Sequence, residues 1–156
     1  MPLNVITGNS GNNVLKGTAG SDDIYGFRGA DKLTGGGGTD YFNFAINESK
    51  ASVGQADTIT DWNHRQDYID SSIAGTAGSY AEVFSPGGIF FGVNNISQAR
   101  SLVENSNALS ANDHVFVYNG RDGYLLSDLN HNGTFETGVV LLGAGSASDM
   151  TWSDII

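Results

Sequence analysis

The chain has 156 residues, which suits one domain or two small subdomains packed together. Its formal net charge of −10 argues against binding to nucleic acid or to an anionic membrane surface. It has no cysteine, so no disulfide staples the fold, and neither a signal peptide nor a stretch of transmembrane length is visible.

Four nonapeptides run without a gap from Gly8 to Asn43: GNSGNNVLK, GTAGSDDIY, GFRGADKLT and GGGGTDYFN. Glycine holds positions 1 and 4 of every repeat. Position 6 is Asn13, Asp22, Asp31 or Asp40, and position 8 is Leu15, Ile24, Leu33 or Phe42. This pattern is typical of parallel β-rolls that bind calcium. A flexible glycine-rich linker is the alternative, but a linker has no reason to place a large apolar residue at every ninth position.

The period predicts the geometry of the roll. Positions 1 to 6 form a turn in which glycine permits unusual backbone angles, and positions 7 to 9 form a short strand. Each nonapeptide is half a coil, so turns 18 residues apart stack. Asn13 is then above Asp31, and Asp22 lies between Asn4 and Asp40. Ser49 occupies the next sixth position, where the pattern ends.

The stacked sixth positions indicate the ligand. Carboxylates about 5 Å apart repel each other unless a cation lies between them. Calcium suits such a gap because it takes roughly six to eight oxygen ligands, main-chain carbonyls included. The turns offer no sulfur or imidazole to a softer metal. We therefore predict Ca²⁺, bound more strongly near Asp22, Asp31 and Asp40 than near Asn13, because an amide carries no charge.

Beyond the repeats, the pattern is mostly that of β-strands. The segment 41–46 reads as a strand that leaves the roll with Phe42, Phe44 and Ile46 on one face. The segments 57–62 and 67–70 read as short strands, and residues 80–93 as two apolar runs split by a turn at 85–88. A helix is expected within 95–109, with one apolar face: Ile96, Ala99, Leu102 and Val103. Three more strands follow, with the sequences HVFVYN, GYLLSD and TGVVLLGA.

These elements predict an all-β chain with at most one short helix. A short parallel β-roll at residues 1–45 runs into an antiparallel β-sandwich that forms the capping region, residues 46–156, and the two pack as one module. Trp62 and Trp152 are expected to pack in or beside the core rather than to bind sugars.

The repeats, followed by DTITDW, DYID and a terminal β region, resemble the C-terminal RTX domain of serralysin-type secreted metalloproteases. The similarity is strong over residues 8–62 and 112–156 and weak over 71–111. Related β-roll modules end secreted lipases and mannuronan epimerases. The resemblance implies two calcium sites. One is drawn from Gly17, Ala19, Asp22, Gly36, Gly38 and Asp40, and the other from Gly8, Ser10, Asn13, Phe27, Gly29 and Asp31. The chain departs from the family pattern where Asn9, Thr18 and Phe27 replace the second glycine.

Two further places are candidates for calcium. Asp57 and, less strongly, Asp61 lie just past the repeats and could close the last turns of the roll, or they could be solvated strand ends. The segment 128–136 has the D-x-N-x-N-G core of an EF-hand loop. Its twelfth position is Val139 instead of glutamate, which argues against an EF-hand. A hairpin turn with Asn-Gly chemistry and a calcium-stapled β-turn both remain open.

Catalytic motifs are missing from the sequence. His64, His114 and His131 lack metal-ligand spacing, and there is neither a G-x-S-x-G elbow nor a cysteine nucleophile. The ending Asp154-Ile155-Ile156 resembles the C-terminus of proteins exported by type I secretion in Gram-negative bacteria. An ordinary last strand is the alternative.

We therefore expect a non-catalytic calcium-binding module that is secreted and folds on binding calcium outside the cell. Its expected partners are calcium ions, the type I secretion machinery and an upstream catalytic or passenger domain; nucleic acid and membrane insertion are not expected. The main alternative is a module that binds an acidic polysaccharide of the alginate type. A free-standing enzyme is a third, weaker alternative.

Overall fold

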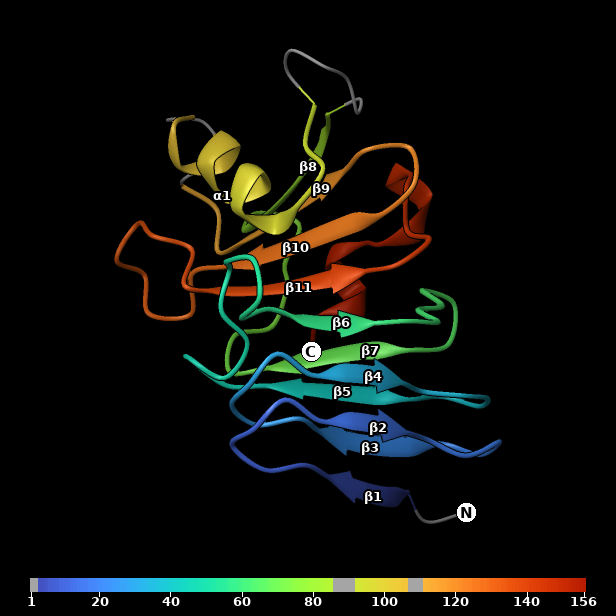
Figure 1. The fold of residues 1–156 in the computed structure, drawn as a ribbon. Coiled ribbons are helices and arrows are strands. Elements are labelled where there is room, and N and C mark those ends of the chain that lie inside the picture. Colours follow the sequence, from blue (N-terminus) through green and yellow to red (C-terminus); the bar gives the residue numbers. More distant parts are fainter. Residues whose placement is uncertain (1–2, 86–91, 107–110) are drawn as a thin grey trace.

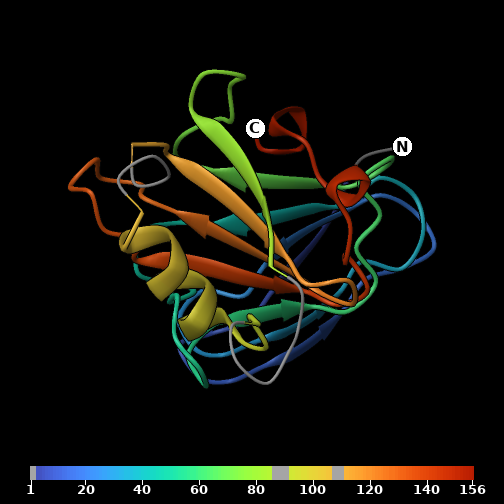
Figure 2. The ribbon, with the colours of Figure 1, turned by 90° about the horizontal axis from the view of Figure 1, so that it is seen from above.

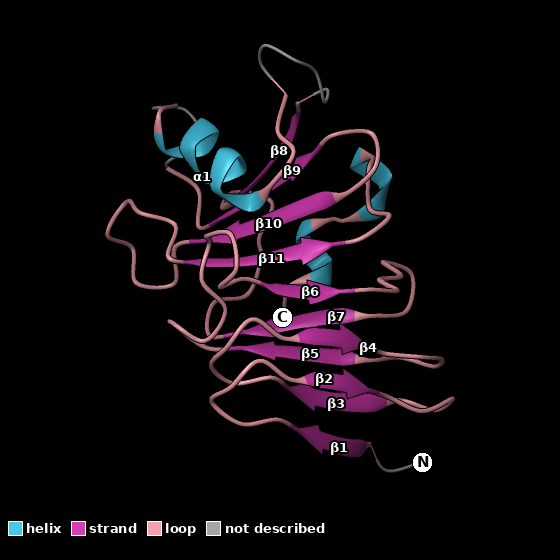
Figure 3. Ribbon diagram, viewed as in Figure 1, coloured by secondary structure: helices cyan, strands magenta, loops and turns pink. Residues whose placement is uncertain are grey.

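The computed structural model describes residues 3–85, 92–106 and 111–156. Within these ranges the chain forms two β-sheets that face each other, with one α-helix beside them (Figure 1). One sheet has the order β1 (Asn4–Thr7), β3 (Asp22–Tyr25), β5 (Tyr41–Phe44) and β7 (Tyr68–Ser71). The other has the order β2 (Val14–Lys16), β4 (Lys32–Thr34), β6 (Asp57–Ile59), β11 (Thr137–Leu141), β10 (Gly123–Ser127), β9 (His114–Tyr118) and β8 (Tyr80–Phe84). The expected all-β fold is confirmed (Figure 3).

The first five strands alternate between the two sheets, as half a coil per nonapeptide requires. Their pairings with one another are parallel and carry the expected 18-residue register, such as Ile6 with Ile24 and Leu15 with Leu33. The eighth positions point between the sheets. Ile24, Leu33 and Phe42 are fully buried there, whereas Leu15 is only partly buried because it lies near the open N-terminal end of the roll.

Parallel pairing continues past residue 45. The strand β5 was predicted to leave the roll, but it lies inside a sheet between β3 and β7. Likewise, β6 pairs with β4. The prediction for Ile46 was wrong: β5 ends at Phe44, the chain turns, and the Ile46 side chain is 38% exposed. The roll pairing therefore extends to Ser71, and strands from both sides of the expected boundary share the same two sheets.

The capping region adds an antiparallel unit to the edge of the roll. The strands β9, β10 and β11 are antiparallel neighbours, and β11 joins the roll by pairing in parallel with β6. The last pair, β8 with β9, is also parallel. The antiparallel expectation therefore holds for β9 to β11, while both ends of this unit are parallel. One side chain core fills the roll and continues under β9 to β11 through Phe116, Leu125 and Leu141.

The helix α1 (Ile96–Glu104) covers β10 and β11 on one side (Figure 2). It begins at Asn95, whose side chain accepts a hydrogen bond of 3.0 Å from the Gln98 N–H and so caps the first turn. Ile96, Ala99 and Val103 are buried, but Leu102 is 38% exposed, so the predicted apolar face is narrower than expected. The predicted turn at 85–88 and the predicted end of the helix at 109 fall largely outside the described residues.

The C-terminal segment packs against β7. After two 3₁₀ turns (Ala147–Asp149 and Trp152–Asp154), Ile155 is buried and forms a parallel bridge with Ile69. Trp62 donates a hydrogen bond of 2.7 Å to the Asp149 carbonyl and packs on the core, as expected, whereas Trp152 is 46% exposed. In the described ranges, no helix is long and apolar enough to cross a membrane.

Candidate metal centre

The turns of the roll stack in main-chain contact. A Cβ atom on Gly17 would lie 1.9 Å from the Gly35 carbonyl oxygen, and one on Gly36 would lie 2.0 Å from that of Thr18. Gly36 also has a φ angle of +99°, a conformation that L side chains rarely adopt. The Gly37 N–H donates to the Thr18 carbonyl at 3.0 Å. Glycine is required because the turns 17–22 and 35–40 approach more closely than any side chain allows.

One column of sixth-position side chains links four turns. Asn4 donates its amide to Asp22 at 2.9 Å, the Asp22 N–H donates to Asp40 at 3.0 Å, and the Asp40 N–H donates to Asp67 at 3.3 Å. Asp22 and Asp67 each also accept a hydrogen bond from the start of their own turn, from the Thr18 and Asn63 N–H groups. Each carboxylate of this column therefore lies between two stacked turns.

A second column runs along the other edge of the roll. The Asn13 N–H donates to Asp31 at 2.7 Å, and the Asp31 N–H donates to Asp57 at 2.8 Å. The Asp57 N–H donates in turn to the Ser49 hydroxyl, which donates to the Gly138 carbonyl. The column that begins in the repeats thus ends against β11, in the capping region.

These aspartates are buried without a cationic partner. Five of them are at most 5% exposed: Asp22, Asp31, Asp40, Asp57 and Asp67. The ion pairs found in the described ranges involve none of the five. One carboxylate oxygen each of Asp31 and Asp57, Oδ2 in both, is buried and has no hydrogen-bond partner. Buried negative charges that lack partners destabilise a fold unless something neutralises them.

Burial also raises the pKa values of four of these aspartates. Burial raises the pKa of Asp57 to about 8, opposed by the hydrogen bond from Asp31 and reinforced by the charges of Asp31 and Glu48. Burial likewise raises the pKa of Asp67 to about 6, and the charges of Asp40 and Asp61 add to the shift. The pKa values of Asp31 and Asp40 are also raised, mainly by burial.

Asp22 differs from the other buried aspartates. Burial acts to raise its pKa, but hydrogen bonds from the Thr18 N–H, the Asn4 amide and the Thr18 hydroxyl together lower it. Its negative charge is therefore stabilised by fixed donors even before any ion binds, whereas Asp57 has one oxygen with no donor at all. The need for a cation is greatest at the Asp31–Asp57 end of the second column.

The structure brings together the turns from which both predicted ligand sets are drawn. Turn 17–22 contacts turn 35–40, and turn 8–13 contacts turn 26–31. Asp57 lies in the second column and is buried there, so of the two alternatives left open by the sequence it is not a solvated strand end. Asp61 is exposed and accepts hydrogen bonds from the Gly35 and Gly36 N–H groups, so it caps the last repeat. Whether each of these oxygens binds calcium remains a prediction.

Asp67 was missed by sequence reasoning. It is buried in the first column, where it accepts a hydrogen bond from the Asp40 N–H. A signal existed: Asp67 and Ile69 in DYID have the spacing of the sixth and eighth positions of a repeat, and so do Asp57 and Ile59 in DTI. Both segments pair with repeat strands as further rungs of the roll.

The arrangement defines the kind of site. No three His, Cys, Asp or Glu side chains gather as a metal-binding group in the part of the chain that the structure describes. The stacked turns instead offer paired carboxylates together with main-chain carbonyls at close approach. Such an all-oxygen set suits a calcium ion, which tolerates irregular geometry, better than magnesium, which demands a near-ideal octahedron.

Fold and site together define a calcium-binding parallel β-roll module. The family model of the RTX calcium-binding nonapeptide repeat matches residues 7–42 in four copies. Residues 7–42 are therefore RTX repeats, and the recognised resemblance is confirmed there. The comparison with curated protein sequences finds no match.

Solved structures include modules of similar fold. The AlgE6R3 subunit of the mannuronan C5-epimerase from Azotobacter vinelandii is 23% identical with a TM-score of 0.52, over 96% of this chain and 80% of that one. The AlgE6R2 subunit of the same enzyme is 21% identical with a TM-score of 0.41, over 99% of this chain and 92% of that one. The first likeness shows a shared fold.

Proposed function

We propose that this chain is a non-catalytic calcium-binding module of an exported protein, and that it folds when it meets calcium outside the cell. The observation that carries the proposal is the pair of buried, unpartnered carboxylate oxygens of Asp31 and Asp57 at the junction between the roll and the capping region. Where calcium is scarce, folding must bury these carboxylates either charged or with an added proton, and both oppose folding. Calcium at about millimolar concentration matches the affinity of extracellular modules, so binding supplies folding free energy.

The proposed ligands lie in three stacked pairs of turns. The first pair contributes Gly17, Ala19, Asp22, Gly36, Gly38 and Asp40. The second contributes Gly8, Ser10, Asn13, Phe27, Gly29 and Asp31. The third joins Asp31 to Asp57. The second pair has the amide of Asn13 where the first pair has a second carboxylate, so it carries less charge and its affinity is the weakest.

Export by the type I secretion machinery fits this behaviour, because an unfolded chain is easier to move through a channel than a folded one. We infer a secreted location and an upstream catalytic or passenger domain that the folded module stabilises. The support is the RTX repeats at residues 7–42. In the folded protein Asp154 and Ile155 are buried, and the main chain of Ile155 and Ile156 is hydrogen-bonded to β7 and the loop after it.

The substitution Asp57→Asn tests the closing ligand. It removes one negative charge with little change in shape, and we expect the calcium concentration at half-folding to rise by about tenfold, because calcium affinity depends on the number of charged ligands. Circular dichroism during a calcium titration measures this midpoint. Asp23→Asn is the matched control: it removes a charge from the outer face of the roll, and its midpoint should stay near that of the wild type.

The sign of the Asp57→Asn effect is decisive. If Asp57 were only an unfavourable buried charge, neutralising it would ease folding and lower the calcium midpoint. A midpoint that falls or stays constant would therefore remove Asp57 from the calcium site.

Binding of an acidic polysaccharide is the second candidate function. A cleft of about 460 Å³ beside the turns is lined by two exposed cations, Arg28 and Lys50, together with the amides of Asn12, Asn47 and Gln55. Cations and amides at such a cleft match the carboxylates and hydroxyls of a uronate. Glu48 also lines the cleft and opposes an anion, which makes this the weaker candidate.

The double substitution Arg28→Gln with Lys50→Gln tests the cleft. We expect it to abolish the retardation of the calcium-loaded module in affinity electrophoresis with soluble oligomannuronate, because both cations of the cleft are lost. Lys16→Gln removes an exposed cation of β2 that does not line the cleft and should leave the retardation unchanged. A wild-type module that migrates equally with and without the glycan would reject this candidate.

A further inference from the structure

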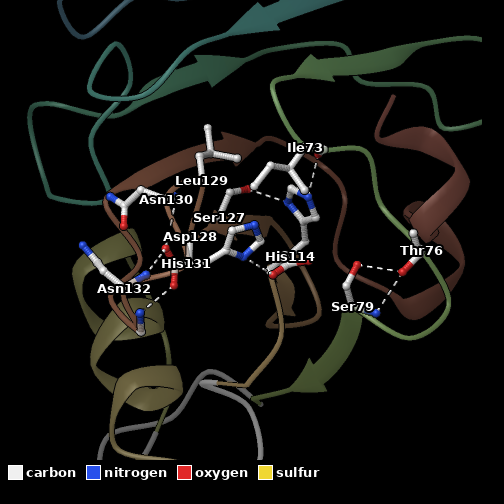
Figure 4. Close-up of polar contacts among 12 residues, drawn as sticks. Ile73, Thr76, Ser79, His114, Ser127, Asp128, Leu129, Asn130, His131 and Asn132 are labelled. Carbon is white, nitrogen blue, oxygen red and sulfur yellow. Dashed lines mark hydrogen bonds and ion pairs between the residues drawn. The ribbon is translucent and has the colours of Figure 1, made fainter.

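The loop that joins β10 to β11 folds around a carboxylate (Figure 4). Asp128 is only 4% exposed. Its Oδ2 accepts a hydrogen bond of 2.7 Å from the Gly133 N–H, and its Oδ1 accepts longer ones from the Asn130 and Asn132 N–H groups. Gly133 has a φ angle of +81° and His131 one of +55°, so the loop makes a tight double bend over Asp128. Main-chain N–H groups therefore hold the Asp128 carboxylate in place, but no cationic side chain of the described residues forms an ion pair with it.

A second carboxylate enters the loop from its other end. Glu136 Oε1 accepts a hydrogen bond of 3.0 Å from the Leu129 N–H, the residue next to Asp128. Glu136 Oε2 is buried and has no hydrogen-bond partner. Neither Asp128 nor Glu136 takes part in any of the ion pairs formed by the described residues. Two negative charges therefore converge on one nine-residue loop, and one buried oxygen lacks any neighbour that could satisfy it.

The positions of the oxygen-bearing residues in this loop follow those of a calcium-binding loop. If Asp128 is position 1 of a calcium loop, Asn130 and Asn132 stand at positions 3 and 5 and the Thr134 carbonyl at position 7. Position 12, Val139, is buried in β11 opposite Leu125 and provides no ligand. Glu136 stands at position 9 and is the second carboxylate of the loop, with one buried oxygen that has no hydrogen-bond partner. His131 forms an ion-pair contact of 2.9 Å with Asp113, so its imidazole is engaged elsewhere.

We propose that the β10–β11 loop is a calcium site separate from those of the roll, in which Asp128, Asn130, Asn132 and Glu136 supply the side chain oxygens. The set is entirely oxygen, which selects a hard cation, and its irregular nine-residue geometry favours calcium over magnesium. The site belongs to the capping region and shares no ligand with the roll. Leu129 and Phe135, both buried, anchor the two ends of the loop in the core, so an ion here holds the loop between β10 and β11 against that core.

Amide NMR of the whole chain tests this site apart from the roll when the calcium titration starts from a chain that circular dichroism already shows to be folded. We expect the amides of residues 130–133 to shift as calcium is added, and the wild type to bind about one more calcium per chain than Glu136→Gln or Asp128→Asn. Asp113→Asn is the matched control, because it removes a carboxylate beside the same loop that is already engaged with His131. This control should bind as much calcium as the wild type, and its loop amides should still shift.

The outcomes separate this site from the function proposed for the roll. Loop amides that shift in wild type and control but not in Glu136→Gln support the site, whatever the roll does. Loop amides that stay unshifted in the folded chain, while circular dichroism still shows calcium-dependent folding, would overturn it and leave the roll intact. An equal loss of binding in Asp113→Asn would also overturn it, because a diffuse negative surface would then explain the effect.

Discussion

In a chelator the chain is expected to lose most of its β-sheet circular dichroism, and calcium at about millimolar concentration is expected to restore it. The strands of the roll are only three or four residues long and cannot hold together by pairing alone. Their turns also stack buried carboxylates, of which Asp31 and Asp57 each have an oxygen without a partner. Without a cation, the repulsion acts at the point where the roll joins the capping region.

The measurement is a far-ultraviolet spectrum and a thermal melt of the same sample in chelator and at increasing calcium. Because calcium binds the folded state, the melting temperature should keep rising with the free calcium concentration. Magnesium at the same concentration is the control and should restore little structure, because it requires near-octahedral geometry. A chain that is already β-rich in chelator, with a melting temperature that calcium does not change, would contradict the proposed function.

Gly17→Ala is expected to prevent or severely weaken the folding that calcium induces. The added methyl group would lie 1.9 Å from the Gly35 carbonyl oxygen and 2.7 Å from Asp22 Oδ2. Since both neighbours belong to the stacked turns, relief of the clash must separate turn 17–22 from turn 35–40. Overpacking of this kind costs about 3 kcal/mol. The melting temperature at saturating calcium and the calcium midpoint both report the loss.

Gly20→Ala is the matched control for the same turn. Its Cβ would lie 3.8 Å from the nearest atom, the Thr18 hydroxyl oxygen, so the methyl group meets ordinary contact distances. The control should fold at nearly the wild-type calcium concentration. Equal losses in the two variants would mean that the turn needs glycine for main-chain freedom alone, and that the close stacking of turns is not what controls calcium binding.

The regular repeats made their part of the fold predictable. The nine-residue period places a carboxylate at every sixth position and an apolar side chain at every eighth, and the pairing of Asp22 with Asp40 follows from the 18-residue register. That register was predicted correctly because each coil has the same length. The helix was also found, since Ile96, Ala99 and Val103 have helical spacing, although its apolar face is narrower than the pattern suggested.

The end of the roll was not predictable in the same way. Asp57 follows its stacking partner Asp31 by 26 residues, and Asp67 follows Asp40 by 27, so neither keeps the 18-residue register. Between β5 and β6 the chain leaves the roll and then returns to it. A nine-residue period cannot predict the length of such a connection. Ile46 shows the same limit: alternation placed it inside, but the strand had already ended at Phe44.

The sequence by itself determined the parallel roll, its calcium chemistry and its apolar interior, because local spacing alone sets which side chains stack and which point inward. Only the tertiary structure decided where the roll ends and which charges lack partners. Burial or a missing hydrogen-bond partner is what marks three carboxylates as candidate ligands: Asp57, Asp67 and Glu136. Burial depends on packing between segments that are far apart in the chain, so the sequence of one segment does not determine it.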